Sequence, residues 1–191
     1  MARPRKFDEG RAVEAAMRAF WTAGYEATST QELCAATGLG RSSIYNTFAS
    51  KHELFVKALS HYMDQHTTRL VDVLEDDTKP IRERLRTVLE WAVAPDEDDP
   101  SGCLVVNATV ELGPHDPDIA ERLEHDRRRR FAALKAAIEG AVRAGEIDPA
   151  KDADALAHFM ISTVSGIQVA ARGGADRHIL TAIADTAMHS V

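Results

Sequence analysis

Apolar residues recur at intervals of three and four positions along most of this chain, and that spacing limits its possible folds more than any other feature. Val13, Met17 and Phe20 follow it near the start, and Phe55 and Leu59 follow it further on. An α-helix makes one turn in 3.6 residues, so side chains at this spacing line one helical face. The pairs Asn-Gly and Asp-Gly, which favour two-residue hairpins, do not occur. The sequence therefore predicts an all-α protein.

Start and stop signals divide the chain into about nine helices. Ser29 with Glu32, and Ser50 with Glu53, have the spacing of capping boxes. Asp116-Pro117 pairs an N-cap with proline at the first helical position, and Asp148-Pro149 repeats that start signal. The expected helices span residues 8–24, 29–38, 41–48, 50–76, 81–92, 103–112, 116–145, 155–171 and from 176 to near the end.

Charge is distributed unevenly along the 191 residues, whose formal net charge is −7. Residues 1–55 carry seven basic and six acidic side chains, so the negative charge comes from residues 56–191. This asymmetry favours an N-terminal domain, residues 1–55, that faces nucleic acid, and a larger domain, residues 56–191, that does not.

Composition excludes several classes of protein. With 45% apolar and 28% charged residues, the chain is neither collagen-like nor a disordered tail. It has no run of eighteen apolar residues and no signal-peptide pattern, so we expect no membrane contact. Cys34 and Cys103 are isolated, which indicates a reducing cytoplasm. The histidines and the acidic run 96–99 lack metal-ligand spacing, so we expect no metal, and we expect no cofactor. We expect Cys34 to be a buried core residue and Cys103 to be near a pocket.

Residues 28–55 carry the most informative motif. Two short helices are joined by Gly38-Leu39-Gly40, a turn typical of the helix-turn-helix unit. The second helix of such a unit enters the major groove of DNA with its N-terminal residues toward the bases. Here Ile44 and Phe48 would face inward and Tyr45 outward. Arg41 and the following serines supply donors suited to bases and phosphates.

A second DNA anchor follows directly. Lys51 occupies the first position of a helix capped by Ser50, where backbone amides, the helix dipole and an ammonium group converge on one phosphate-sized space. The basic N-terminus would form a flexible arm along the DNA. The expected DNA contacts are Arg3, Arg5, Lys6, Thr28, Ser29, Arg41, Ser42, Ser43, Tyr45, Asn46, Thr47 and Lys51.

This stretch resembles the DNA-binding domain of the TetR (tetracycline-repressor) family. The agreement covers about the first 55 residues and lies at Gly38, Leu39, Ser43, Ile44, Tyr45, Phe48, Ser50, Lys51, Leu54 and Phe55. Two positions depart from the pattern: Thr47 stands where the family often has His, and Gly40 where a Ser often caps the recognition helix. Gly at an N-cap costs only a few tenths of a kcal/mol relative to Ser.

The resemblance implies a homodimeric repressor that binds a palindromic operator and is released by a small-molecule effector. The eighth helix is apolar nearly all round, so we expect one side to meet its own core and the other a second subunit. The expected dimer interface from the last two helices is Phe159, Ile167, Ile179, Ile183 and Ala187.

Helices five to eight are the expected walls of the effector pocket. The candidate side chains are Trp91, Asn107, Glu111, Arg127, His158 and Ser162. Within the run 127–130, three arginines would be solvated and paired along the helix, whereas Arg127 shares the apolar stripe of Leu123 and Phe131. Either Arg127 forms a buried ion pair, with Glu111 or Asp116 as partner, or it anchors an anionic effector.

Two other functions stay open at this point. A regulator with this motif can be controlled by a protein partner instead of a small molecule. An all-α enzyme is the other alternative, but the chain has no Gly-rich phosphate loop, no GxSxG and no HExxH motif. We therefore expect no enzymatic activity.

Overall fold

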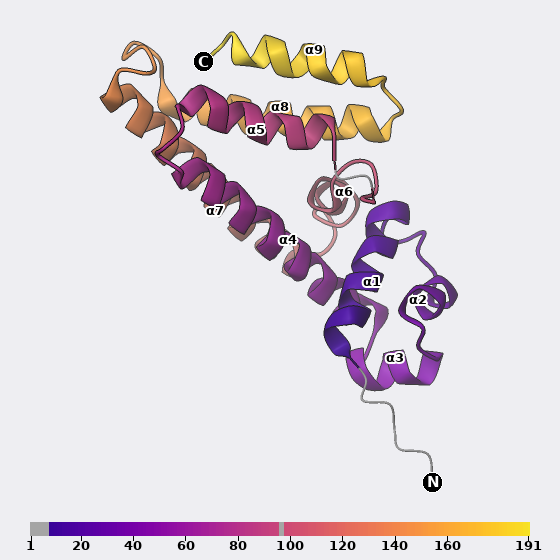
Figure 1. The fold of residues 1–191 in the computed structure, drawn as a ribbon. Helices are drawn as coiled ribbons and strands as arrows, with labels where there is room; N and C mark the ends of the chain where they lie inside the picture. The colour runs from indigo at the N-terminus through magenta and orange to yellow at the C-terminus, as the bar shows by residue number, and fades with distance from the viewer. Residues whose placement is uncertain (1–7, 96–97) are drawn as a thin grey trace.

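The computed structural model describes residues 8–95 and 98–191, and α-helices are the only regular elements among them (Figure 1). The all-α prediction is therefore confirmed. The helices are α1 (Glu9–Ala23), α2 (Thr30–Thr37), α3 (Arg41–Phe48), α4 (Lys51–Glu75), α5 (Ile81–Val93), α6 (Leu104–Glu111), α7 (Pro117–Ala144), α8 (Ala153–Arg172) and α9 (Arg177–Met188).

Local capping chemistry sets the helix starts near the N-terminus. The side chain of Ser29 accepts a hydrogen bond from the Glu32 amide, and the Glu32 carboxylate accepts one from the Ser29 amide, so this capping box is complete. The Ser50 hydroxyl accepts from the Glu53 amide at 3.0 Å, which caps α4. These contacts satisfy amides that have no partner within the helix.

The start signal at Asp148-Pro149 is wrong by one helical turn. There the Asp148 carboxylate accepts from the Ala150 amide and forms a turn. The eighth helix begins at Ala153, because Asp152 is its N-cap and its carboxylate accepts from the amides of Asp154 and Ala155. An Asp-Pro pair favours a turn as well as a helix start, so this signal alone does not distinguish them.

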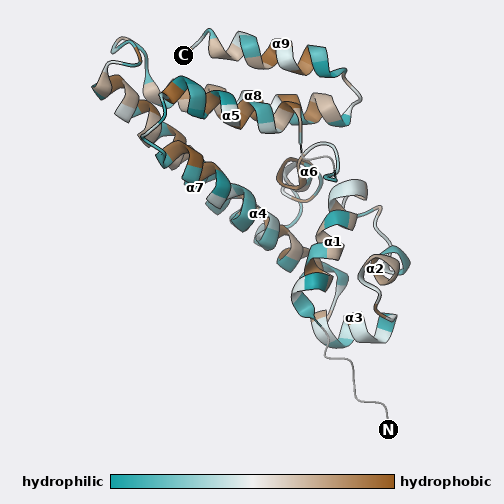
Figure 2. Cartoon of the chain, in the orientation of Figure 1, coloured by the Kyte–Doolittle hydropathy of each residue, from teal (hydrophilic) through white to brown (hydrophobic). Residues whose placement is uncertain are grey.

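Helices α4 and α7 pack against each other along the long diagonal of the molecule (Figure 1). Helices α1–α3 lie at one end of this pair and α5, α8 and α9 at the other, with α6 between them. Figure 2 shows hydrophobic and hydrophilic residues alternating along the helices, as amphipathic packing requires. None of the helices formed by residues 8–95 and 98–191 combines the length and hydropathy needed to cross a bilayer.

Two hydrophobic cores hold the fold together. The first joins α1–α3 and the first half of α4 with α6 and the start of α7; the second joins the rest of α4 with α5, α7, α8 and α9. The expected domain boundary after residue 55 falls inside the continuous helix α4. Helices α4, α6 and α7 therefore connect the N-terminal unit to the body through shared packing.

Candidate functional site

The helix-turn-helix unit has the geometry that the sequence predicts. Gly38 ends α2 in the left-handed conformation, with φ 69° and ψ 15°, which favours glycine. Gly40 is the N-cap of α3 and contributes no side-chain hydrogen bond. Ile44 and Phe48 are buried at 1% and 2% exposure, so they fix the orientation of α3 against the core.

The opposite face of α3 is open to solvent. Its exposed side chains are Arg41, Ser42, Ser43, Tyr45, Asn46 and Thr47. The Arg41 guanidinium lies 5.7 Å from the centre of the Tyr45 ring, and the Tyr45 hydroxyl is 3.3 Å from that of Thr30. The hydrogen bond with Thr30, aided by Arg41, lowers the pKa of Tyr45. This face offers one guanidinium and several hydroxyls for bases and phosphates.

Other expected DNA contacts differ in their placement. Thr28 is wrong as a surface contact, since it is 1% exposed and its hydroxyl donates to the Gly24 carbonyl at 2.6 Å. Ser29 is exposed but serves as the α2 cap. Lys51 begins α4, and its Nζ lies 4.4 Å from the Tyr25 ring centre. The expected basic arm, Arg3, Arg5 and Lys6, lies outside the described residues.

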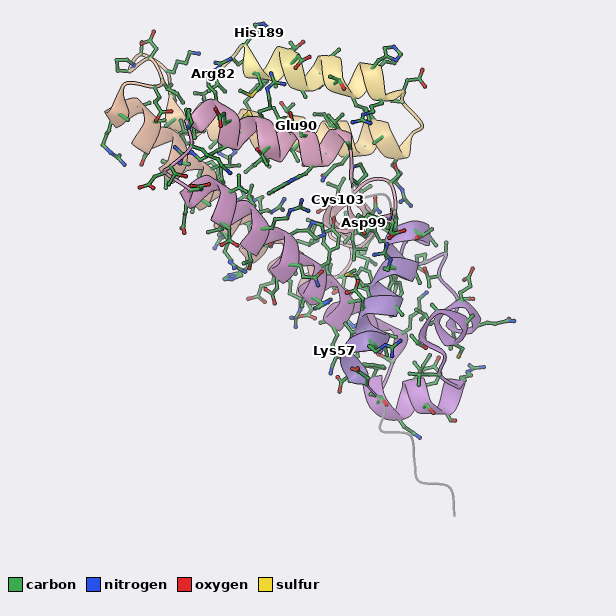
Figure 3. All side chains as sticks on the ribbon, in the orientation of Figure 1. Lys57, Arg82, Glu90, Asp99, Cys103 and His189 are labelled. Atoms are coloured by element: carbon green, nitrogen blue, oxygen red, sulfur yellow. The ribbon has the colours of Figure 1, made fainter. Side chains whose placement is uncertain are left out.

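A cavity of about 130 Å³ lies between α4–α8 and the end of α1. Trp21, Tyr62 and His66 form its aromatic wall: the Trp21 and Tyr62 rings meet edge to face at 4.9 Å, and the Tyr62 and His66 rings stack at 3.9 Å. Trp91, from α5, lines the same cavity as expected. Cys103 is also in the wall, and Figure 3 shows it beside α6.

Several polar side chains of this wall contact one another. The Asp126 side chain, 3% exposed as a residue, accepts from the Thr67 hydroxyl at 2.6 Å and pairs with the Arg130 Nε at 2.8 Å. The Tyr62 hydroxyl donates to the Cys103 Sγ at 3.4 Å. Burial, with Cys103 as a second cause, raises the pKa of Tyr62, so the phenol is neutral.

The expected buried position of Arg127 on the core-facing stripe is wrong, because its side chain is exposed. Arg127 lines a separate pocket with Arg130, so its alternative role as an effector anchor stays a prediction. Its Nε and Nη2 donate to the Glu124 carboxylate at 2.6 and 2.8 Å. Glu124 also accepts from Arg128, and these two guanidinium groups lower the pKa of Glu124 to about 2. The inward position on this part of α7 belongs to Asp126 and Arg130, so Arg130 is also less solvated than expected.

Four more effector candidates do not line the cavity. Glu111 accepts hydrogen bonds from the Tyr25 and Glu26 amides at 2.9 and 2.7 Å, and so connects α6 to the turn after α1. Asn107 donates to the Trp21 carbonyl at 3.5 Å. His158 and Ser162 are exposed on α8, where the His158 ring lies 4.4 Å from that of a neighbouring phenylalanine.

A contact that the sequence analysis missed joins α8 to the end of α1. Arg172 donates through Nη1 to the Trp21 carbonyl at 3.1 Å and through Nη2 to the Thr22 carbonyl at 3.2 Å. These carbonyls belong to the last turn of α1, which has no partners for them within the helix. A basic residue in the last turn of a helix usually interacts with the C-terminus of that same helix. The sequence position of Arg172 therefore does not indicate that it binds the carbonyls of α1.

The predicted dimer face is partly exposed and partly buried within the protomer. Phe159, Ile179 and Ile183 are 41%, 44% and 37% exposed, which leaves an apolar face on α8 and α9. Ile167 and Ala187 are only 0% and 1% exposed, because they pack in the second core of their own chain. The assignment of Ile167 to the surface between subunits is therefore wrong, whereas Ala187 lines a pocket on the exposed face together with Phe159 and Ile183.

The two cysteines differ in their burial. Cys103 is buried and lines the cavity, in agreement with its expected place near a pocket. Cys34 packs against the first core, as expected of a core residue, but it is only partly buried.

A recognition helix held by two buried residues, with an exposed polar face and a larger helical body, defines a helix-turn-helix DNA-binding protein. Residues 12–58 match the family described as "Bacterial regulatory proteins, tetR family", and residues 82–186 match "Tetracyclin repressor-like, C-terminal domain". The chain belongs to the TetR family and is a DNA-binding transcriptional regulator.

Individual relatives agree with this assignment. The HTH-type transcriptional repressor ComR of Escherichia coli (strain K12) is 32% identical over 97% of this chain and 90% of its own length. The transcriptional repressor BdcR of the same organism is 30% identical over 90% of this chain and 83% of its own. The TetR family regulator CifR, solved as a cysteine mutant with 26 bp operator DNA, is 31% identical, covers 98% of both chains and has a TM-score of 0.85.

Proposed function

We propose that this chain is a homodimeric transcriptional repressor of the bacterial cytoplasm, released from its operator by a small molecule bound in the cavity beside Trp21. The relatives named as repressors and the operator complex of CifR support the repressor role. Binding of the operator and of the effector is sufficient for a repressor, so we propose no catalytic step.

DNA recognition is assigned to the exposed face of α3 and to the start of α4. Arg41 reads a base, because a guanidinium at the N-terminal end of a recognition helix reaches guanine in the major groove. Lys51 binds a phosphate at the N-terminus of α4, where the helix dipole adds attraction. Two copies of α3 in one dimer require an operator with two-fold symmetry.

Dimerisation is assigned to the exposed apolar face of α8 and α9, which includes Phe159, Ile179 and Ile183. Three large apolar side chains near each other on one surface are typical of an interface. A two-fold axis through this face would pair it with itself.

Trp21 is the residue that couples the cavity to the DNA-binding unit in this proposal. Trp21 belongs to α1 of the DNA-binding unit, yet its ring lines the cavity. Its carbonyl is bound by Arg172 of α8 and Asn107 of α6. A ligand that moves the Trp21 ring therefore acts on α1 directly. The ligand binds the released arrangement more tightly than the DNA-bound arrangement. DNA affinity falls by the same factor as the ratio of these two ligand affinities.

The test begins with selection of genomic fragments by the full chain, followed by fluorescence anisotropy on the selected operator. Arg41→Ala should weaken operator binding by roughly 1–3 kcal/mol more than binding to random DNA. Lys51→Ala should weaken both equally and reduce the salt dependence by about one ion. Arg128→Ala, which removes an exposed arginine on α7, is the control and should change neither.

Equal losses on operator and random DNA for Arg41→Ala would overturn its base-reading role. Control by a protein partner is the alternative mode of regulation. The two modes separate in the same assay, because operator release by compounds alone requires no second protein.

A further inference from the structure

The formal charges of the arginines and aspartates that line the cavity sum to zero. Two arginines and two aspartates line it among the described residues. Asp126 pairs with Arg130 at 2.8 Å, and Asp99 is 3.0 Å from Arg18 just outside the lining. The guanidinium of Arg69, the other lining arginine, stacks over the Trp91 ring at 4.1 Å. Because the two arginines and two aspartates of the lining contribute no net formal charge, the cavity gives no net attraction to a charge of either sign and favours a neutral ligand.

Among the described residues, two buried donors of the wall have no hydrogen-bond acceptor: the Arg130 Nε–H, which still forms an ion pair with Asp126, and the Trp21 indole N–H. Trp21 is 2% exposed, and among residues 8–95 and 98–191 its indole Nε1–H has no hydrogen-bond partner. A buried donor left unsatisfied is costly, whereas most buried polar groups in folded proteins are paired. Because Trp21 lines the cavity, a bound ligand whose acceptor atom reached the indole N–H would satisfy this group.

The size of the cavity limits what can bind there. Its volume of about 130 Å³ is close to the ~150 Å³ of an engineered apolar cavity that binds benzene. Pockets for drug-sized ligands are larger, roughly 300–1,000 Å³. A ligand the size of one substituted aromatic ring fits beside Trp21, Tyr62 and Trp91, but a long acyl chain does not.

We propose that the effector is a small, uncharged, largely apolar molecule that carries one oxygen acceptor, which receives the Nε1–H of Trp21 while its body packs against the aromatic wall. This inference rests on the ligand-responsive function proposed above and adds the chemical class of the ligand. It makes Trp21 both the polar contact of the ligand and the first residue of the DNA-binding unit that the ligand touches.

Two probe molecules of matched shape test the acceptor. Acetophenone has a carbonyl oxygen, and α-methylstyrene has a methylene group in its place. The chain has two tryptophans, so an ¹H,¹⁵N spectrum of the full protein contains two indole signals. Trp91→Phe assigns them. The Trp21 indole proton should shift downfield with acetophenone, as a new hydrogen bond requires, and not with α-methylstyrene.

Calorimetric titrations measure the dissociation constants of both probes for each variant. The two probes differ in hydrophobicity, so the ratio of their dissociation constants is compared between variants. Trp21→Phe should raise the Kd of acetophenone by roughly 3- to 10-fold relative to that of α-methylstyrene, the effect of one lost neutral hydrogen bond. Arg128→Ala, on the exposed side of α7 and outside the cavity lining, is the control and should leave the ratio unchanged. Benzoate should bind the wild-type protein more weakly than acetophenone.

Three results would overturn the proposal: no binding of acetophenone at millimolar concentration, the same indole shift with both probes, or tighter binding of benzoate. If Trp21→Phe fails to fold, the indole shift in the spectrum of the wild-type chain still tests the hydrogen bond to the ligand. Operator release is measured in parallel. Acetophenone bound through Trp21 without any change in DNA affinity would contradict the ligand-responsive function alone. Release by benzoate alone would contradict only the ligand class.

Discussion

Glu111 provides the sharpest test of how the body holds the DNA-binding unit. Its two carboxylate oxygens accept from the Tyr25 amide at 2.9 Å and from the Glu26 amide at 2.7 Å. A hydrogen bond to a charged acceptor is worth about 1.5–3 kcal/mol net. The Tyr25 amide is partly buried and counts in that range, whereas the exposed Glu26 amide adds less because water replaces its partner. Glu111→Ala should therefore lower the free energy of unfolding by about 2–3 kcal/mol.

For a chain of 191 residues, that loss corresponds to a fall in Tm of about 5–10 °C. Circular dichroism melts and urea titrations measure it, with Glu121→Ala on the exposed face of α7 as the control. Hydrogen exchange should show faster exchange at the amides of Tyr25 and Glu26. If Glu111→Ala were as stable as Glu121→Ala, with unchanged exchange at both amides, the proposed link between α6 and the DNA-binding unit would be refuted.

Three further predictions concern the backbone, pH and the dimer. Ala49 follows α3 with φ 62° and ψ −44°, a strained conformation for a residue with a Cβ, so Ala49→Gly should raise the free energy of unfolding by about 0.5–1 kcal/mol in thermal melts; an unchanged or lower Tm would show that the backbone is not strained there. The Asp116 carboxylate accepts from the amide that it caps and from His52 at 2.7 Å, and these bonds lower the pKa of Asp116 below its ordinary 3.8. Asp116→Asn keeps the cap, so it should lose about 0.2–1 kcal/mol at pH 7. That difference from wild type should disappear as the pH falls below about 4, because protonation then removes the same interaction from the wild type; a difference that persisted in acid would assign it to another cause. Ile183→Glu should weaken the dimer more than about 100-fold in sedimentation experiments, because it buries an unpaired charge, whereas Thr181→Glu on the exposed side of α9 should not; a dimer intact in both variants would place the interface elsewhere.

The parts of this fold that the sequence predicts are those with local causes. Ser29 and Glu32 cap α2 with groups three residues apart, so their interaction needs no knowledge of the rest of the chain. The outward face of α3 follows in the same way from two buried residues, Ile44 and Phe48, four positions apart. The pattern of the DNA-binding surface is therefore contained within about thirty residues.

Contacts between distant residues explain what the sequence could not predict. Glu111 binds amides 85 and 86 positions away, and Arg172 binds carbonyls about 150 positions away. No spacing rule connects such pairs. Ile167 shows the same limit, because a helix that is apolar on all sides gives no sign of which side meets its own core.

The arginines of α7 show how one distant contact selects between two local patterns. Arg127 pairs with Glu124, and Arg130 pairs with Asp126, at the similar spacings of three and four residues. Positions 126 and 127 both lie three or four residues after buried Leu123, so helical periodicity permits either one to face inward. The Thr67 hydroxyl of α4 donates to Asp126 at 2.6 Å, which gives the inward carboxylate a partner. That choice places Asp126 and Arg130 in the cavity wall and leaves Arg127 in solvent.

A buried ion pair is weak evidence for stability, because apolar residues of similar volume in its place are often neutral or stabilising. The pair formed by Asp126 and Arg130 is therefore not explained by the energetics of the core alone. Its position in the cavity wall supplies a different reason: the two charges cancel, the wall stays polar, and a ligand meets no excess charge. This arrangement suits the neutral ligand proposed above, and the donor that would distinguish its oxygen from a methylene group belongs to Trp21 of the DNA-binding unit itself.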